Sequence, residues 1–168
     1  MKVRELMTKT VASCHAETNL AAAGALMWES DCGFLPVVDD YGKVTGVLTD
    51  RDVCIAVTTA DRKPSAMKVE DVVKGRAVMC NQDDDIRTVL NTMQKHRIRR
   101  LPAVSKAGLL EGIVSLNDIV LRATRSGPRQ QAADISFGDI VQAIQTICAP
   151  KPPRSHHAHS GNRTADAA

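Results

Sequence analysis

The chain has 168 residues, of which 43% are hydrophobic, 24% are charged and 2% are aromatic, and its net charge is +3. This composition is typical of a globular protein with one domain or two small halves that share an aliphatic core. No apolar run approaches the ~20 residues of a membrane-spanning helix. Residues 1–6 carry charges where a signal peptide would be apolar. We therefore expect a cytoplasmic protein with no membrane partner.

The chain contains an internal duplication with a constant offset of 66 residues. It covers roughly residues 3–58 and 69–124, so we expect domains at 1–60 and 66–125, a helix at 134–149 and a disordered tail at 150–168. Identical pairs that keep the offset include Val3 and Val69, Cys14 and Cys80, Met27 and Met93, Leu35 and Leu101, Pro36 and Pro102, Val38 and Val104, Gly42 and Gly108, Gly46 and Gly112, and Asp52 and Asp118.

Each half predicts the element order β-α-β-β-α. A short apolar strand is followed by a helix with an i, i+3, i+4, i+7 apolar stripe, two further strands around a glycine turn, and a second helix. In the first half these elements are strand 10–12, a helix capped by Thr18, strands 35–38 and 44–48, and a helix that opens at Thr49. In the second half they are strand 77–79, a helix capped by Asp84, strands 101–104 and 110–114, and a helix that opens at Ser115.

A half of about 55 residues buries too little surface to be stable alone. We therefore expect an α/β (α+β) fold in which the two repeats pack sheet to sheet around a pseudo-twofold axis into one module. Such packing leaves two related clefts between the halves, where small ligands usually bind.

Residues 125–129 form an expected linker, after which Ser136 caps a C-terminal helix with a single apolar stripe. We expect this helix to pack back on the module in preference to forming a dimer interface. Its stripe consists of Phe137, Ile140, Val141, Ile144, Ile147 and Cys148. The polar tail that follows contains His156, His157 and His159, and we expect it to be solvated, with no metal bound.

The number and spacing of the cysteines indicate their chemical state. The five cysteines (Cys14, Cys32, Cys54, Cys80 and Cys148) include no C-x-x-C pair, so we expect reduced, mostly buried side chains and no disulfide or zinc framework.

Residues 1–68 have a net charge of −1 and residues 69–168 a net charge of +4. The excess gathers in residues 96–100 and at Arg122, Arg125 and Arg129, which indicates a bound anion.

Two equivalent segments, residues 46–52 and 112–118, carry the candidate chemistry. Each places Thr49 or Ser115 three residues before an aspartate, Asp52 or Asp118, which is a capping box and can be explained as helix capping alone. The same arrangement suits a nucleotide, because a helix start favours phosphate and a carboxylate accepts hydrogen bonds from the two hydroxyls of a ribose.

These repeated motifs, Gly-hydrophobic-hydrophobic-Thr/Ser-x-x-Asp and Leu-Pro, resemble those of tandem CBS domain proteins, over about residues 1–125. The family is named after cystathionine β-synthase. The resemblance implies a disc with two clefts for AMP, ATP, other adenosine compounds or S-adenosylmethionine. It also implies a homodimer and a regulated partner protein that the sequence does not identify.

The resemblance assigns roles residue by residue. Asp118 and Ser115 match the residues at the ribose, and Arg99 and Arg100 match the phosphate-gripping pair of the γ subunits of AMP-activated kinase. Gly33 and Phe34 replace that pair in the first half, so we expect the second half to be the better site, with Arg51 as a substitute cation in the first. The full set of expected ligand-binding residues is Ser115, Asn117, Asp118, Arg99, Arg100, Ala77, Val78, Pro102, Thr49, Arg51, Asp52, Val11 and Ala12.

We expect a regulatory module without catalytic residues, metal or obligatory cofactor, because the chain has no phosphate-cradling glycine loop, HExxH motif or nucleophile elbow. Its ligand would be an adenine nucleotide. The alternatives are a scaffold that dimerises without ligand, and a module that binds S-adenosylmethionine or NAD(H). Nucleic-acid binding is disfavoured by the small net charge and the scarcity of stacking aromatic residues.

Overall fold

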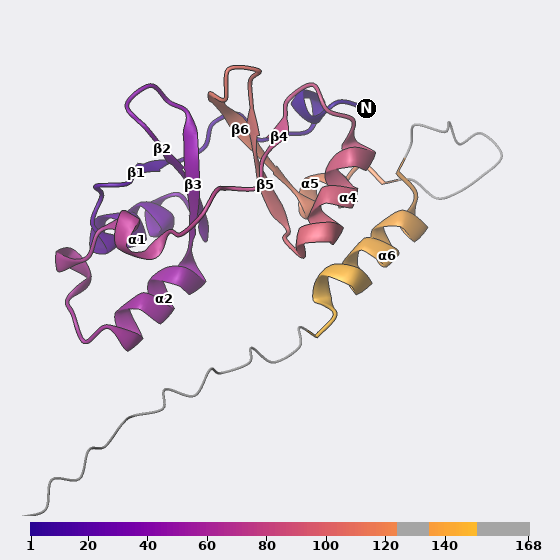
Figure 1. Ribbon diagram of the computed structural model, residues 1–168. Coiled ribbons are helices and arrows are strands. Elements are labelled where there is room, and N and C mark those ends of the chain that lie inside the picture. The colour runs from indigo at the N-terminus through magenta and orange to yellow at the C-terminus, as the bar shows by residue number, and fades with distance from the viewer. Residues whose placement is uncertain (124–134, 151–168) are drawn as a thin grey trace, which may run out of the picture.

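Two three-stranded sheets, one from each repeat, lie side by side at the centre of the computed structural model, which describes residues 1–123 and 135–150 (Figure 1). The first half consists of β1 (Cys14–His15), α1 (Leu20–Glu29), β2 (Phe34–Val38), β3 (Val44–Thr49) and α2 (Asp50–Thr59). The second consists of β4 (Cys80–Asn81), α4 (Ile86–His96), β5 (Arg100–Val104), β6 (Leu110–Ser115) and α5 (Leu116–Val120). Short 3-10 turns at Val3–Glu5 and Pro64–Ala66, the helix α3 (Val69–Val72) and the helix α6 (Phe137–Cys148) complete the described chain.

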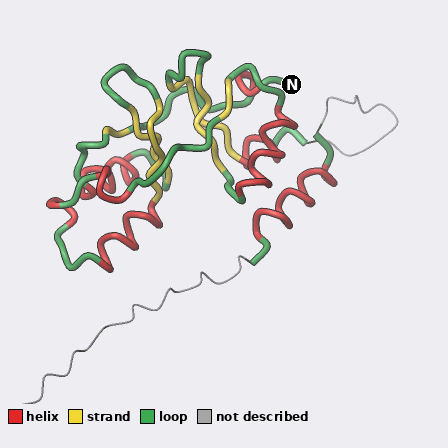
Figure 2. The backbone as a smooth tube through the Cα atoms, in the orientation of Figure 1, coloured by secondary structure: helices red, strands yellow, loops and turns green. Residues whose placement is uncertain are grey.

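The sheets have the same topology, which confirms the predicted β-α-β-β-α repeat. In each, the short first strand runs parallel to the middle strand, and the middle strand pairs antiparallel with the last. The registers are equivalent, since Cys14 faces Val37 in one sheet and Cys80 faces Ala103 in the other. Figure 2 shows the helices gathered below the two sheets, with the hairpin loops at the opposite edge.

Two local predictions were wrong in position. The first strand of each half begins at Cys14 or Cys80, after the expected segments 10–12 and 77–79. The helices α1 and α4 are capped by Asn19 and Asp85, whose side chains accept from the N–H groups of Ala22 and Arg87.

The expected caps, Thr18 and Asp84, bind backbone N–H groups that precede the helices. The Thr18 hydroxyl accepts from the His15 N–H at 3.1 Å, and the Asp84 carboxylate accepts from the Asn81 N–H at 2.8 Å. These side chains therefore stabilise the turn that precedes each helix.

The beginning of each repeat packs against the other half. Residues Val3 and Met7 lie in the core of the second half, and Met67 and Val69 lie in the core of the first. The crossed segments also form backbone hydrogen bonds, from Thr8 to Ile113 and back at 2.9 and 3.0 Å. In Figure 1 the N-terminus accordingly lies beside the second half. The two halves are therefore joined by exchanged segments as well as by their sheets.

The hairpin turns meet across the pseudo-twofold axis. Gly42 and Gly108 have φ values of 77° and 83°, which a side chain would strain. The N–H of Val44 donates to the Gly108 carbonyl at 3.2 Å, and the N–H of Leu110 donates to the Gly42 carbonyl at 3.0 Å. This reciprocal pair fixes the orientation of one sheet against the other.

The C-terminal helix α6 packs back on the module, as predicted, and lies along α4 (Figure 1). Its apolar residues do not form one buried stripe, however. Ile140 and Ala143 are buried against the second half, whereas Phe137, Val141 and Ile144 are 40–54% exposed. Ser136 caps the helix, as predicted.

The cysteines are free thiols, but the expectation that they are mostly buried was wrong. Cys14 and Cys80 are buried, and burial raises their pKa values to about 11 and about 12. Cys32 is half-buried, and Cys54 and Cys148 are exposed. The predicted linker 125–129 and the predicted tail from residue 151, with its histidines, lie outside the described residues.

Within residues 1–123 and 135–150, no helix has the length and apolar character to cross a membrane. In the same residues, no three His, Cys, Asp or Glu side chains gather where they could hold a metal ion.

Candidate functional site

Two clefts lie where the halves meet, and each is lined by both halves. The cleft here called the Asp52 cleft has a volume of about 640 Å³ and contains Thr49, Asp52, Ala77 and Val78. The Asp118 cleft has a volume of about 490 Å³ and contains Val11, Ala12, Ser115 and Asp118. Both volumes are in the range of small-molecule sites.

The aspartate of the Asp52 cleft is fixed by the capping box at the start of α2. The Thr49 N–H and hydroxyl donate to Oδ2 of Asp52 at 3.1 and 2.6 Å, and the Asp52 N–H donates back to the Thr49 hydroxyl at 3.2 Å. All of these bonds to the carboxylate use Oδ2. Within the described chain, Oδ1 of Asp52 therefore has no protein partner and is available to a ligand.

The Asp118 cleft repeats this geometry at the start of α5. The Ser115 N–H and hydroxyl donate to Oδ2 of Asp118 at 2.7 and 2.8 Å, and the Asp118 N–H donates back at 3.2 Å. The cap and the ligand site are thus compatible, because capping occupies one carboxylate oxygen and leaves the other.

The fold divides the site that the sequence suggested for the second half. Ser115 and Asp118 lie with Val11 and Ala12 in one cleft, whereas Arg99 lies with Ala77 and Val78 in the other. The physical reason is that segments 8–12 and 74–78, near the start of each repeat, cross to the other half. Each of them therefore lies beside the capping box of the other repeat. The Asp52 cleft therefore combines the first-half motif with the second-half arginines.

Two expected ligand residues lie in neither cleft. Asn117 is exposed, and Pro102 is buried in β5. Arg51, by contrast, lies in the Asp52 cleft beside the arginines that it was expected to replace.

The Asp52 cleft is strongly basic. Six basic and two acidic side chains line it, a formal charge of +4; the basic ones are Arg51, Lys74, Arg76, Arg97, Arg99 and Arg100, and the acidic ones are Asp50 and Asp52. Among the described residues, none of these six cations forms an ion pair within 4.0 Å. Unpaired cations around a cavity repel one another, so the arrangement favours a polyanionic ligand.

Three of these cations, Lys74, Arg76 and Arg97, are not among the ligand-binding residues expected from the sequence, although Arg97 belongs to the basic segment 96–100. Lys74 and Arg76 flank Gly75 immediately before Ala77 and Val78, which are among the expected ligand-binding residues, so this position was the available signal. Arg97 ends α4 in the left-handed conformation, with φ of 52°, and this turn directs the chain into Arg99 and Arg100.

The C-terminal helix also contributes to the Asp52 cleft. Ile147 and Cys148 of α6 line it. Just beyond the helix, an Arg97 guanidinium N–H donates to the Pro150 carbonyl at 3.4 Å. The helix that follows the duplication is therefore in contact with the basic cleft.

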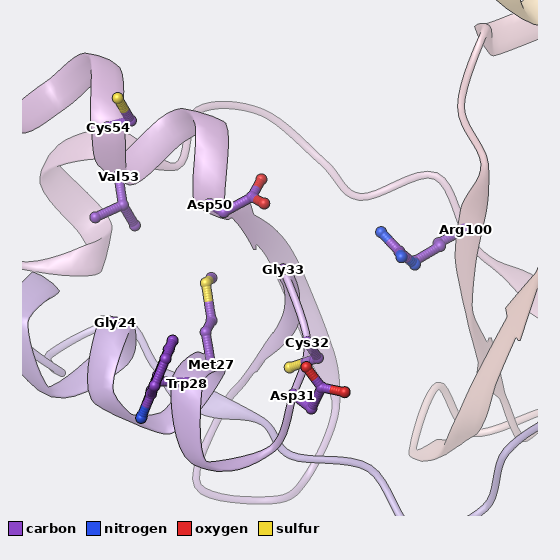
Figure 3. Close-up of a pocket in the computed structure, with 10 residues that line it drawn as sticks. All are labelled: Gly24, Met27, Trp28, Asp31, Cys32, Gly33, Asp50, Val53, Cys54 and Arg100. Atoms are coloured by element: carbon purple, nitrogen blue, oxygen red, sulfur yellow. The ribbon is translucent and has the colours of Figure 1, made fainter.

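Arg100 occupies a central position between the cavities. It lines both clefts and also a third hollow of about 510 Å³ at α1 and α2. Figure 3 shows Arg100 projecting from β5 toward Asp50 across this hollow, with Met27 and Val53 on its inner wall. Asp50 itself lies against Gly33, where any Cβ would collide with its carboxylate. A side chain at position 33, which is equivalent to Arg99, would therefore require the exposed Asp50 side chain to move.

Two segments of the chain, residues 3–58 and 69–124, match the family model of the CBS domain. Protein YlbB of Bacillus subtilis is 34% identical over 140 residues, which are 82% of this chain and 93% of YlbB. Hypoxic response protein 1 of Mycobacterium tuberculosis is 30% identical over 147 residues, which are 88% of this chain and 94% of that protein.

Solved structures share the fold. Hypoxic Response Protein I with two coordinated zinc ions has a TM-score of 0.65 at 30% identity, covering 72% of this chain and 98% of that one. A CBS domain pair in complex with 5'-methylthioadenosine and S-adenosyl-L-methionine has a TM-score of 0.65 at 22% identity, covering 72% and 94%. A CBS domain protein of Thermoplasma acidophilum has a TM-score of 0.68 at 23% identity, covering 87% and 77%. The chain therefore belongs to the CBS domain family and carries two copies of that domain.

Proposed function

We propose that this protein is a regulatory module without catalytic activity, which senses a phosphate-bearing adenosine nucleotide bound in the Asp52 cleft. The observation that carries the proposal is the set of six unpaired basic side chains around a fixed aspartate whose Oδ1 is free. No cofactor is required, and the nucleotide acts as a reversible signal.

Each part of the cleft suits one part of a nucleotide. Oδ1 of Asp52 accepts hydrogen bonds from the ribose hydroxyls, and half-buried Ala77 and Val78 provide an apolar wall for the base. Arg97 and Arg99 reach the phosphates, where a guanidinium forms paired, charge-assisted hydrogen bonds. The start of α2 adds positive potential from the helix dipole.

One of the comparisons supports an adenosine-type ligand. A CBS domain pair of the same fold was solved with 5'-methylthioadenosine and S-adenosyl-L-methionine. Hypoxic Response Protein I was solved with zinc. The proposal for this chain rests on the clefts, where a capping-box aspartate and small apolar residues suit a nucleoside.

The output of the module passes through α6. This helix contacts the Asp52 cleft through Ile147 and Cys148, and it exposes Phe137, Val141 and Ile144 on another face. A change in cleft occupancy can therefore alter an apolar surface that is suited to a second copy of the chain or to a regulated protein. We place this homodimeric sensor in the cytoplasm.

A thermal-shift panel of AMP, ADP, ATP, NADH and S-adenosylmethionine tests the proposal. A ligand that binds only the folded state stabilises it by RT ln(1 + [L]/Kd), about 2.7 kcal/mol at a hundredfold excess over Kd. We expect the phosphate-bearing adenosine nucleotides to raise Tm and inorganic pyrophosphate to compete with them. If no compound in the panel changes Tm, the ligand-independent scaffold becomes the better account.

A further inference from the structure

The two clefts have opposite formal charge, although they share many equivalent positions. Six basic residues line the Asp52 cleft, and at an offset of 66 residues every one of them has a neutral or acidic counterpart. The counterparts of Lys74, Arg76, Arg97 and Arg100 line the Asp118 cleft and are, in order, Thr8, Thr10, Asp31 and Phe34. The counterparts of Arg99 and Arg51, which are Gly33 and Asn117, do not line it.

The charge reversal is clearest at the corner that ends the first helix of each half. Asp31 and Arg97 both adopt left-handed backbone, with φ of 46° and 52°. Both corners are held by the same hydrogen bonds, and the N–H groups of Cys32 and Ile98 donate to the carbonyls of Met27 and Met93 at 2.9 and 3.0 Å. Identical backbone therefore presents a carboxylate to one cleft and a guanidinium to the other.

A second substitution replaces a cation with an apolar wall. Phe34, the counterpart of Arg100, is 8% exposed, and both residues line both clefts. The Asp118 cleft is lined by two acidic side chains, Asp31 and Asp118, and by one basic side chain, Arg100. Since Arg100 also lines the Asp52 cleft, a phosphate bound there takes the one cation that the two clefts share.

We propose that the Asp118 cleft binds a nucleoside-type ligand that carries no phosphate, either uncharged or positively charged, while the Asp52 cleft binds the anion. This inference rests on the proposed function for the role of the Ser115–Asp118 box at a ribose. It goes further in assigning two different ligand classes to one module. The reason is electrostatic, because a dianionic phosphate meets a formal charge of −1 in one cleft and +4 in the other.

The test weakens the Asp52 cleft with Asp52→Asn and measures the Kd of adenosine and of AMP by calorimetry, with and without Asp118→Asn. We expect the adenosine binding that Asp118→Asn abolishes to be tighter, by about tenfold or more, than any AMP binding that it abolishes, because charge repulsion opposes the phosphate in the Asp118 cleft. AMP binding that Asp118→Asn leaves unchanged belongs to the Asp52 cleft. AMP binding that is as tight as that of adenosine and is abolished by Asp118→Asn, or adenosine that does not bind Asp52→Asn at all, would overturn the inference.

A matched charge swap gives a second test of the ligand preference of the Asp118 cleft. Thr10→Arg with Asp31→Arg introduces the residue type found at the equivalent positions 76 and 97 and changes the formal charge of the cleft from −1 to +2. Both side chains are exposed, and position 31 has the same backbone conformation as Arg97. In the Asp52→Asn background, this swap should make AMP the tighter ligand.

Single Asp31→Arg is used if the pair does not fold, as judged by Tm. An unchanged preference for adenosine in a folded swap variant would contradict the electrostatic explanation. The failure of the proposed function would look different: AMP would then fail to bind the parent protein, while the adenosine measurement in Asp52→Asn would still be decisive.

Discussion

Val3 and Val69 occupy equivalent positions in the two repeats, and the side chain of each is fully buried in the core of the opposite half. Val3 packs with the second half, and Val69 packs with the first. The start of each repeat thus packs in the core of the other repeat. This exchange also places the capping box of each repeat beside the starting segment of the other in the clefts.

The exchange predicts that both halves unfold together. Val3→Ala and Val69→Ala should each lower the free energy of unfolding by about 1–3 kcal/mol, because each removes two buried methyl groups and leaves a cavity. Denaturant titration should retain one cooperative transition in both variants.

Val141 supplies the matched control for this experiment. It is 54% exposed on α6, so Val141→Ala should change the unfolding free energy by less than about 0.5 kcal/mol. Two separate transitions in the Val3→Ala protein would show that the halves are independent and would contradict the exchanged core.

The repeat, the capping boxes and the Leu-Pro strands could be predicted from the sequence, because each depends on residues close together in the chain. Thr49 with Asp52 and Ser115 with Asp118 are examples. The grouping of the site could not be predicted, because it depends on where segments 8–12 and 74–78 cross. The sequence alone paired Asp118 with Arg99, whereas the fold places Asp52 beside Arg99.

The C-terminal helix was also predictable only in part. Ser136 and the apolar spacing indicated its start and its period, and both agree with α6. The spacing of apolar residues does not show, however, how much of the apolar face of α6 the neighbouring helix α4 covers. Contact with α4 buries Ile140 and Ala143 and leaves Phe137 and Val141 exposed. Its contact with the Asp52 cleft depends on the path of the chain after α5, which local patterns do not determine.

The arginines of the Asp52 cleft should control nucleotide affinity and its salt dependence. Arg99→Gln removes one charged hydrogen-bond donor, so AMP should bind about tenfold or more weakly, with a flatter dependence of Kd on ionic strength. Arg122→Gln is the control, since Arg122 is exposed and lines neither cleft. Equal losses in both variants would indicate a general charge effect and no specific phosphate contact.

The thiol of Cys148 should report occupancy of the Asp52 cleft. Cys148 is exposed and lines the cleft, whereas exposed Cys54 lines only the hollow at α1 and α2. Saturating AMP should therefore slow alkylation of Cys148, measured by peptide mass spectrometry, and leave Cys54 unaffected. Cys14 and Cys80 should stay unmodified in either state, because burial raises their pKa values to about 11 and about 12. Equal rates at Cys148 with and without AMP would place the nucleotide elsewhere.

The attachment of α6 should weaken in acid. Hydrogen bonds from the Ser136 N–H and hydroxyl, at 2.8 Å each, lower the pKa of Asp139, with a smaller contribution from Arg87. A carboxylate with a lowered pKa in the folded protein stabilises it above the unfolded pKa, and this contribution is lost as pH falls through the folded value. The effect should therefore be present at neutral pH and lost below about pH 4.

Unfolding free energies between about pH 6 and pH 3 measure this dependence. Asp139→Asn should be less stable than the parent at the upper end and lose less stability on acidification. Asp40→Asn is the control, because the Asp40 side chain is 97% exposed. An Asp139→Asn protein with the same pH profile as the parent would rule out this carboxylate as the source.

We propose that a phosphate-bearing nucleotide binds to Asp52 together with the arginines of the second half. Calorimetry of AMP binding to Asp52→Asn and Asp118→Asn tests this assignment. Both substitutions keep an acceptor at the cap, so Tm without ligand should change little. We expect Asp52→Asn to weaken AMP binding about ten- to a hundredfold, through the loss of a charged hydrogen bond, and Asp118→Asn to change it less than about threefold. A large loss in Asp118→Asn with normal binding in Asp52→Asn would contradict it.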